Sequence, residues 1–290
     1  MTDLKKIPSS QIERLRYIEF SLKFLGVFSR ADLIERFGIG TAAASRDIAK
    51  YKELAPQNFD HSSNSRNFAL NNNWKSLFEF ESSEVLNQLT GRTLHTTNRI
   101  YISNDILDMI DSPNIELVAA ISRAIFNKKA IEVDYFSKSN GLSTKIIVPH
   151  AFVYNGTRWH MRGYDRKRER FADFVISRFQ AARSSDVDVY DNERQKQDDQ
   201  WNRIVKLEII PHPDFSNPEA LANEFNMKNG VLEKRVRASS VGYYLQKLYV
   251  DCAKEATKGE HYFRLRLKNR LALYGVENLG LAPNFDGFEE

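Results

Sequence analysis

The fold of this chain is decided by residues 158–179, which read RWHMRGYDRKRERFADFVISRF. At its start, this stretch alternates cationic and apolar side chains with the two-residue period of a β-strand. One face of the strand receives Arg158, His160, Arg162 and Tyr164, and the other receives Trp159 and Met161. A strand anchored by tryptophan on one face and positively charged on the other is suited to hold an anion. We therefore interpret this region as a sensor and not as a catalyst.

The neighbouring segments predict a small, strongly bent sheet around this strand. Alternating apolar residues predict further strands at 131–136, 144–148, 150–154 and 170–174. Pro149 is expected to interrupt the ladder, because proline has no amide hydrogen to donate.

A hairpin is predicted at Asn155-Gly156, a dipeptide typical of tight turns. With a three-residue loop, Val153 pairs with Trp159 and the core face stays apolar. The same register places His150 opposite Arg162 on the other face. A two-residue loop would set the apolar face of one strand against the charged face of the other, so we expect the three-residue loop.

The amino-terminal region predicts three helices. One apolar stripe, at helical spacing over about 9–24, contains Ile12, Leu15, Ile18, Leu22 and Leu25. Ser29, followed three places on by Asp32, has the pattern of a capping box that starts a short helix, and Gly38 fits the end of that helix. A third helix is expected from Thr41. Two short helices joined by a glycine-containing turn predict a helix-turn-helix.

The outward face of the third helix is suited to enter a DNA major groove. Small side chains in its first turn let the backbone approach the base edges, while Arg46 reaches a base or a phosphate. Residues 59–70 predict a hairpin with a polar tip, which is the form of a wing that contacts the DNA backbone. We predict DNA contacts from Thr41, Ala42, Ala43, Ser45, Arg46, Lys50, Asn64, Ser65 and Arg66. A plain three-helix bundle with a solvated face is the alternative.

The sheet region resembles the WYL-domain transcriptional regulators, which are named after a Trp-Tyr-Leu triplet in this strand. The triplet reads Trp159-His160-Met161 here, and the surrounding motifs are Pro149-His150, Asn155-Gly156, Gly163-Tyr164-Asp165, Arg170-Phe171 and Ser177-Arg178-Phe179. The resemblance covers about residues 130–180 and implies an Sm-like, SH3-type small β-barrel behind a winged helix. With Ser45-Arg46-Asp47 upstream, the chain looks most like the BrxR and CapW type of regulators found beside phage-defence operons.

The resemblance also implies a pocket for an anionic nucleotide or nucleic-acid ligand. Carried over residue by residue, this pocket would consist of Tyr135, Ser137, His150, Arg162 and Arg178. Two arginines can hold a phosphate through several charge-assisted hydrogen bonds, and an aromatic ring can stack on a base. The alternative for each arginine is an ion pair with Asp165, Glu169 or Asp173.

The carboxy-terminal part predicts a separate α+β module. Residues 191–200 contain no apolar side chain, which indicates a linker or a solvated helix. The module resembles the extension of many WYL regulators, which implies dimerisation or ligand gating. We expect a multidomain α+β chain with a winged helix-turn-helix at 1–73, a helical connector at 74–129, a WYL sensor at 130–190, a linker at 191–202 and a dimerisation module at 203–290.

Composition narrows the class of protein. The chain has 290 residues with a formal net charge of +4, and at roughly 100 to 200 residues per domain it should contain two or three domains. It has no apolar run long enough to span a bilayer and no secretory pattern after Lys5 and Lys6, so we expect a cytoplasmic location. Its single cysteine, Cys252, excludes an internal disulfide and a thiolate zinc cluster. We expect neither a cofactor nor a metal.

These features predict a homodimeric DNA-binding repressor that reads an inverted-repeat operator and responds to the pocket ligand. Two half-sites supply the specificity that one short recognition helix lacks. The rival is a nucleic-acid-processing enzyme, which would need clustered carboxylates for a metal. Asp105, Asp108 and Asp111 have helical spacing and more simply form a solvated face, so we expect no enzyme. A ligand-dependent activator is the third hypothesis, and it differs from the repressor only in operator position.

Overall fold

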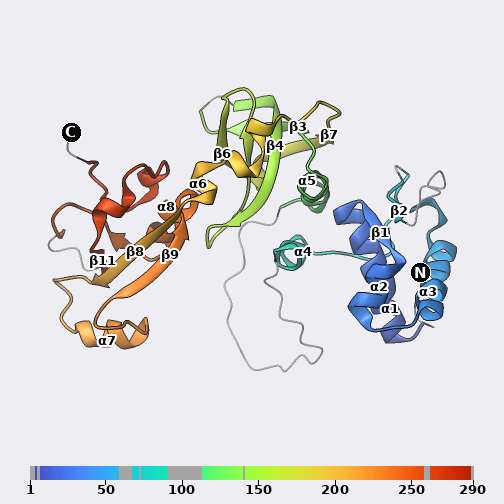
Figure 1. Ribbon diagram of the computed structural model, residues 1–290, viewed down its shortest axis with the longest axis horizontal. Coiled ribbons are helices and arrows are strands. Elements are labelled where there is room, and N and C mark those ends of the chain that lie inside the picture. Colours follow the sequence, from blue (N-terminus) through green and yellow to red (C-terminus); the bar gives the residue numbers. More distant parts are fainter. Residues whose placement is uncertain are drawn as a thin grey trace. The chain divides into compact units, whose positions relative to one another are not determined.

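The computed structural model describes residues 4, 7–58, 67–71, 73–90, 113–139, 141–257 and 262–288. The chain forms two compact units, one of Met1–Phe152 with Met161–Val189 and one of Val153–His160 with Tyr190–Glu290 (Figure 1). The tip of the predicted hairpin therefore belongs with the carboxy-terminal unit. None of the described helices is long and apolar enough to cross a membrane.

The amino-terminal helices form as predicted (Figure 1). They are α1 (Ser9–Phe20), its π-helical continuation η2 (Ser21–Leu25), α2 (Arg30–Phe37) and α3 (Thr41–Leu54). The Ser29 hydroxyl accepts a hydrogen bond from the Asp32 amide at 3.3 Å, and the Asp32 carboxylate accepts one from the Ser29 amide at 2.8 Å. This is the predicted capping box of α2, and Gly38, with a φ of 61°, ends the helix.

The helices share one buried core that explains their packing. It consists of Leu15, Ile18, Leu22, Phe28, Leu33, Ala44, Ile48, Tyr51 and Ala55. In α1 with η2, and again in α3, these positions repeat every three or four residues, so each of these helices buries one stripe, whereas α2 contributes Leu33 alone.

The wing begins with a strand that the sequence pattern does not indicate. β1 (Val27–Ser29) pairs antiparallel with β2 (Asn67–Ala69), and Phe28 lies opposite Phe68. Three residues between two helices are too few to show a two-residue period. The predicted wing tip and its preceding strand, at 59–66, lie outside the described residues.

The middle sheet has five strands preceded by two helices. The helices are α4 (Ser82–Leu89) and α5 (Ile115–Asn127), and the strands are β3 (Ile131–Ser137), β4 (Gly141–Tyr154), β5 (Trp159–Asp165), β6 (Arg170–Val175) and β7 (Phe179–Ser184). The strand order is β6-β5-β4-β3-β7, which places β6 and β7 at opposite edges although only a short turn joins them in sequence. No pairing between these two edges is seen in the described residues, so the expected Sm-like or SH3-type closed barrel is not confirmed.

The loop between β4 and β5 differs from the predicted register. The Asn155 amide donates to the Arg158 carbonyl at 3.2 Å, which closes a two-residue loop in place of the expected three-residue loop. At the other end of the pair, the Arg166 amide donates to the Ile146 carbonyl at 3.3 Å. Between these two bonds β4 uses one residue more than β5, so β4 contains a β-bulge.

Pro149 does not interrupt the strand as expected, because β4 continues through it from Gly141 to Tyr154. Ile147, Val148 and Pro149 are buried in succession, which breaks the usual alternation of a strand. Gly163 of β5 faces this stretch, and the Val148 carbonyl oxygen is 2.6 Å from the place that a Cβ of Gly163 would occupy. Next to the loop, Val153 therefore lies opposite His160 and not opposite Trp159 as predicted, and beyond the bulge the register differs by one residue.

The carboxy-terminal unit contains a second, four-stranded sheet in the order β10-β11-β8-β9 (Figure 1). Its elements are α6 (Asp199–Asn202), β8 (Ile204–Pro211), α7 (Pro218–Glu224), β9 (Leu232–Arg237), α8 (Val241–Lys247), β10 (Val250–Asp251) and β11 (Leu265–Leu267). Val205, Leu207 and Ile209 of β8 pack in one core with Leu245 of α8. The polar segment before the sheet forms short helical turns, in which the buried Glu193 and Asp198 carboxylates accept backbone hydrogen bonds.

The close approach at the bulge predicts the effect of a methyl group at Gly163. Gly163→Ala would place its Cβ against the Val148 carbonyl, which belongs to the backbone and cannot rotate away. We therefore expect the free energy of unfolding to fall by about 1–3 kcal/mol. Gly280→Ala is the matched control, because nothing lies within 4 Å of the added atom, and we expect a change within about 0.5 kcal/mol. Urea unfolding followed by tryptophan fluorescence measures both, and equal stability of the two variants would contradict the bulge geometry.

Candidate functional site

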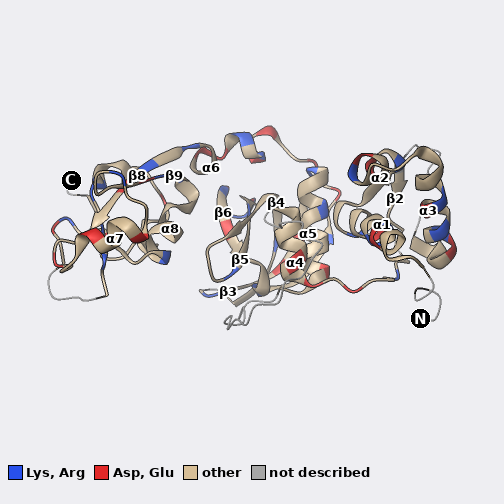
Figure 2. Ribbon diagram, turned by 90° about the horizontal axis from the view of Figure 1, so that it is seen from below, with Lys and Arg blue, Asp and Glu red and all other residues tan. Residues whose placement is uncertain are grey.

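The exposed face of α3 carries the side chains predicted to contact DNA. Ala44, Ile48 and Tyr51 are buried, whereas Thr41, Ala42 and Arg46 are exposed and Ala43, Ser45 and Lys50 are partly exposed. Lys and Arg lie along this helix in Figure 2. Asn64, Ser65 and Arg66 lie outside the described residues.

The cationic side chains on and beside this face differ in whether they already form ion pairs or hydrogen bonds. Lys50 pairs with Glu53 at 2.8 Å, and Arg30 donates to the Ser45 hydroxyl at 3.3 Å. Arg46 makes no hydrogen bond or ion pair with any residue in the described ranges. Its guanidinium is therefore the one on α3 with all donors available to a base or a phosphate.

A buried carboxylate fixes α3 on α1. Asp47 is 2% exposed, and its oxygens accept from Arg14 Nε at 2.5 Å and from Gln11 Nε2 at 2.8 Å. Asp47 follows Arg46 directly, so this pair sets the rotation of α3 that turns Arg46 outward. Sequence reasoning missed the contact because its partners lie more than 30 positions away.

A second buried network holds the far end of α3. Glu19 of α1 accepts from the Leu77 and Phe78 amides at 3.0 Å and from the Tyr51 hydroxyl at 2.9 Å. Burial raises the pKa of the Glu19 carboxyl above its usual value, although these hydrogen bonds oppose the rise. The network joins α1, α3 and the chain that follows the wing, so it stabilises the orientation of α3.

Helix α5 connects the amino-terminal helices with the five-stranded sheet. Its Ser122 hydroxyl, Arg123 guanidinium and Asn127 amide donate to the carbonyls of Phe24, Lys23 and Leu25, at 2.6, 2.6 and 3.1 Å respectively. These are the carbonyls that a helix leaves unpaired at its carboxy-terminal end. The same helix packs against β7, so α5 contacts both halves of the first unit.

The predicted ligand residues are divided between two faces of the five-stranded sheet. Arg162 of β5 pairs with Asp173 of β6 at 3.0 Å, and both side chains are nearly buried. Phe171 lies on the same face of β6 as Asp173, and its ring contacts His150 at 5.8 Å and Tyr164 at 5.2 Å between ring centroids. His150 and Arg162 are therefore brought onto one face, as predicted.

Tyr135 lies on the opposite face. Its ring contacts Phe174 at 5.3 Å and Phe179 at 5.1 Å, and Phe174 follows Asp173 directly in β6. Ser137 contacts Ser139 in the loop after β3, at 3.2 Å between hydroxyls. Arg178 is partly exposed and makes no hydrogen bond or ion pair with a described residue.

Three polar side chains of the strand region, His160, Lys145 and Asp165, are buried. His160, predicted on the charged face, is 4% exposed and its ring lies 5.1 Å from that of Tyr243 of α8. Lys145 and Asp165 form an ion pair at 2.8 Å with side-chain exposures of 7% and 1%. The signal for this pair was available, because Lys145 occupies a position that alternates with the apolar Ile147.

In the parts of the chain that the structure describes, no group of three or more His, Cys, Asp or Glu side chains could hold a metal ion. Asp105, Asp108 and Asp111 lie outside these parts.

Three family models match the chain in succession. Residues 10–91 match the winged helix-turn-helix domain of the BrxR transcriptional regulator, residues 116–184 match the WYL domain, and residues 204–273 match the BrxR C-terminal dimerization domain. The chain thus has, in order, the three domains of the BrxR-type WYL transcriptional regulators. Both BrxR models are named for a transcriptional regulator.

Curated relatives of this BrxR-type chain are named DNA-binding transcriptional repressor CapW. The protein from Pseudomonas aeruginosa is 28% identical over 278 residues, which is 90% of this chain and 89% of the relative. One from Escherichia coli is 28% identical over 280 residues, covering 92% and 91%, and one from Stenotrophomonas maltophilia is 26% identical over 263 residues, covering 85% of both. The similarity thus extends through all three matched domains.

The buried contact of Asp47 predicts a large effect of its removal. Asp47→Ala removes the carboxylate that pairs with Arg14 at a site that is mostly shielded from water. We therefore expect the free energy of opening of the α1 and α3 amides to fall by about 2–4 kcal/mol. Glu53→Ala on the same helix removes only an exposed ion pair and should change protection by less than about 1 kcal/mol. Native-state hydrogen exchange of the α1 and α3 amides measures both, and equal protection in both variants would refute the role of Asp47.

Proposed function

We propose that this chain is a homodimeric repressor that binds an inverted-repeat operator through α3 and the wing. The observation that carries the proposal is the exposed face of α3, on which Arg46 has no partner among the described residues while the adjacent Asp47 is locked to α1. The relatives named CapW, a DNA-binding transcriptional repressor, support the same assignment over about nine tenths of the chain. A protein that binds operator DNA would act in the cytoplasm.

We further propose that an anionic nucleotide or oligonucleotide is the effector and that the regulated genes form a phage-defence operon. The effector would approach the face that carries His150, Arg162, Tyr164 and Phe171, where its phosphate would compete with Asp173 for the Arg162 guanidinium. A ligand changes DNA affinity only if it favours one of two conformations of the protein. The contacts of α5 with both η2 and β7 support a physical connection between the sheet and the winged helix.

The proposed domains keep the boundaries expected from the sequence. They are a DNA-binding domain at 1–73, a connector at 74–129, a sensor at 130–190, a linker at 191–202 and a dimerisation module at 203–290.

Loss of Arg46 should weaken specific DNA binding. Arg46→Ala removes the exposed guanidinium of α3, and we expect affinity for the chain's own upstream promoter to fall by about 1–3 kcal/mol. Lys228→Ala removes an equal charge from the exposed surface of the carboxy-terminal unit and should leave affinity unchanged. Fluorescence anisotropy at fixed salt measures both, with a scrambled duplex as the reference for non-specific binding. Absence of promoter binding by the unaltered chain would overturn the proposed function.

Arg178 provides the cleaner test of the effector site. Arg162→Ala would remove the ion-pair partner of the nearly buried Asp173, whereas Arg178 makes no hydrogen bond or ion pair with a described residue. We expect Arg178→Ala to bind the promoter normally but to lose its response to a short single-stranded oligonucleotide. Arg183→Ala removes a neighbouring exposed arginine that is engaged by Asp134 and Glu132, and it should keep the response. An unchanged response of both variants would place the effector elsewhere.

A further inference from the structure

The carboxy-terminal unit carries a connected group of apolar side chains around the turn η8 (Arg270–Leu273). Leu271 is 81% exposed, the largest fraction among the exposed large apolar side chains in the described residues, and Tyr274 is 72% exposed. The Tyr274 ring contacts Phe288 at 5.7 Å between centroids, and Phe288 contacts Phe285 at 5.3 Å. We call Arg270, Leu271, Tyr274, Phe285 and Phe288 the η8 patch.

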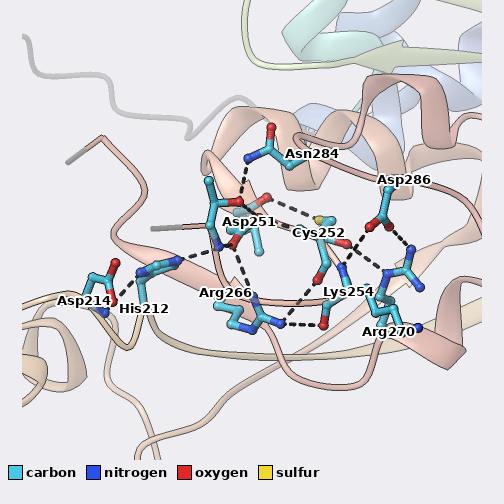
Figure 3. A network of polar contacts seen from close by, with 12 residues as sticks. His212, Asp214, Asp251, Cys252, Lys254, Arg266, Arg270, Asn284 and Asp286 are labelled. Atoms are coloured by element: carbon cyan, nitrogen blue, oxygen red, sulfur yellow. Dashed lines mark hydrogen bonds and ion pairs between the residues drawn. The ribbon is translucent and has the colours of Figure 1, made fainter. Parts of the chain in front are cut away.

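The one cation of the η8 patch is already held in place. The Arg270 guanidinium lies 4.8 Å from the centroid of the Phe285 ring and 5.4 Å from that of Phe288. It also donates to the Asp286 carboxylate and to the Gly287 carbonyl, and its Nε donates to the Cys252 carbonyl at 3.0 Å. Figure 3 shows Arg270 and Asp286 directed toward each other.

Buried hydrogen bonds hold the residues beneath this patch. Asp251 is fully buried and accepts hydrogen bonds from His212, the Thr257 amide and Arg266, at 3.2, 2.9 and 3.2 Å (Figure 3). The adjacent Cys252 is also fully buried, and its carbonyl is the acceptor for Arg270. These hydrogen bonds restrain the backbone beneath the η8 patch, and a preorganised surface lowers the entropic cost of an interface.

The composition of the patch is that of an interface centre. Scattered exposed apolar residues are ordinary on protein surfaces, but here ring contacts join the exposed Tyr274 to Phe288 and Phe285, which are partly buried against the core of the unit. Aromatic residues and arginine are enriched at the centres of protein interfaces and account for most of their binding energy.

A second copy of this chain is the occupant that the observations favour. Residues 204–273 match a dimerization domain, and η8 lies inside that range. In a two-fold dimer the same surface patch of one copy packs against that patch of the other copy. A charged residue at the centre of the patch, if not neutralised, would therefore lie opposite the identical residue of the second copy and be repelled by it. Because Asp286 neutralises Arg270, two η8 patches can meet without like-charge repulsion.

We propose that the η8 patch packs against the η8 patch of a second copy of the chain, with Leu271 and Tyr274 as its anchors. This inference rests on the homodimer of the proposed function and names the surface that forms it.

A charge at the centre of the patch tests the proposal. Leu271→Glu places two carboxylates face to face in the dimer, and we expect the dimer dissociation constant of the full chain to rise by about 30-fold or more. The control is Leu142→Glu, an exposed leucine of β4 at 57% exposure, which should leave the dissociation constant unchanged. Light scattering during size-exclusion chromatography over a dilution series gives the mass of each variant, and circular dichroism confirms that each is folded.

The outcomes separate this proposal from the proposed function. A monomeric Leu271→Glu and a dimeric Leu142→Glu support the η8 interface. If the unaltered chain and Leu271→Glu dimerise equally, the interface lies elsewhere and the homodimer stands. An unaltered chain that is monomeric both in solution and on promoter DNA would overturn the homodimer together with its interface.

Thiol labelling provides a second test that introduces no charge. The native Cys252 is fully buried, and burial raises the pKa of its thiol to about 12, so it reacts poorly with a maleimide. In the dimer, the thiol of Leu271→Cys should react several-fold more slowly than that of Leu142→Cys, and dilution into monomers should abolish the difference. Equal labelling rates of the two dimeric variants would overturn the proposal.

Discussion

The carboxy-terminal end of the first long helix is the constraint on which the first unit depends. A helix leaves its last carbonyls without partners, and a π-helical turn followed by Gly26 in a left-handed conformation leaves those of η2 directed outward. Side chains of α5 satisfy three of them in succession, and Lys23 adds an ion pair to Glu116. Contacts then continue from α5 to β7 and from α1 through Asp47 to α3. Helix α3 and the WYL-domain sheet are thereby joined through two helices.

Buried charged groups provide much of the specificity of this arrangement. Asp47, Lys145, Asp165 and Asp251 are all less than a tenth exposed, and each has at least one oppositely charged or hydrogen-bonding partner. Removing a partner from such a pair costs more than the pair contributes as a whole, because an unpaired charge would remain buried. At Asp251, burial alone would raise the pKa, but hydrogen bonds from the Thr257 and Ala253 amides and from His212 hold the pKa below its usual value. These groups therefore set geometry more than they add stability.

The predicted effector site shows the difference between residue identity and residue placement. The family resemblance indicates His150 and Arg162, and both lie on one face of the sheet with Phe171 and Tyr164. Tyr135 alternates along β3 with Ile131 and Val133, and all three are buried. Its ring packs among aromatic residues of the other face, because a strand directs successive side chains to opposite sides. For Arg162, the ion-pair alternative is present in the structure through Asp173.

The sequence by itself determined the elements whose signal is local. The three amino-terminal helices, the capping box of Ser29 and Asp32 and the burial of Trp159 and Met161 all follow from periodicity or from residues within one turn. Only the tertiary structure decided the bulge of β4, the pairing of β1 with β2 and the partners of Asp47, Lys145 and Arg162. The bulge could not be predicted, because one inserted residue leaves the alternation of apolar and polar residues intact on either side of it. The ion pairs could not be predicted either, because their partners are far apart in the chain and meet only after the strands and helices have packed. Periodicity reports the side of an element that is buried, whereas packing decides what lies opposite it.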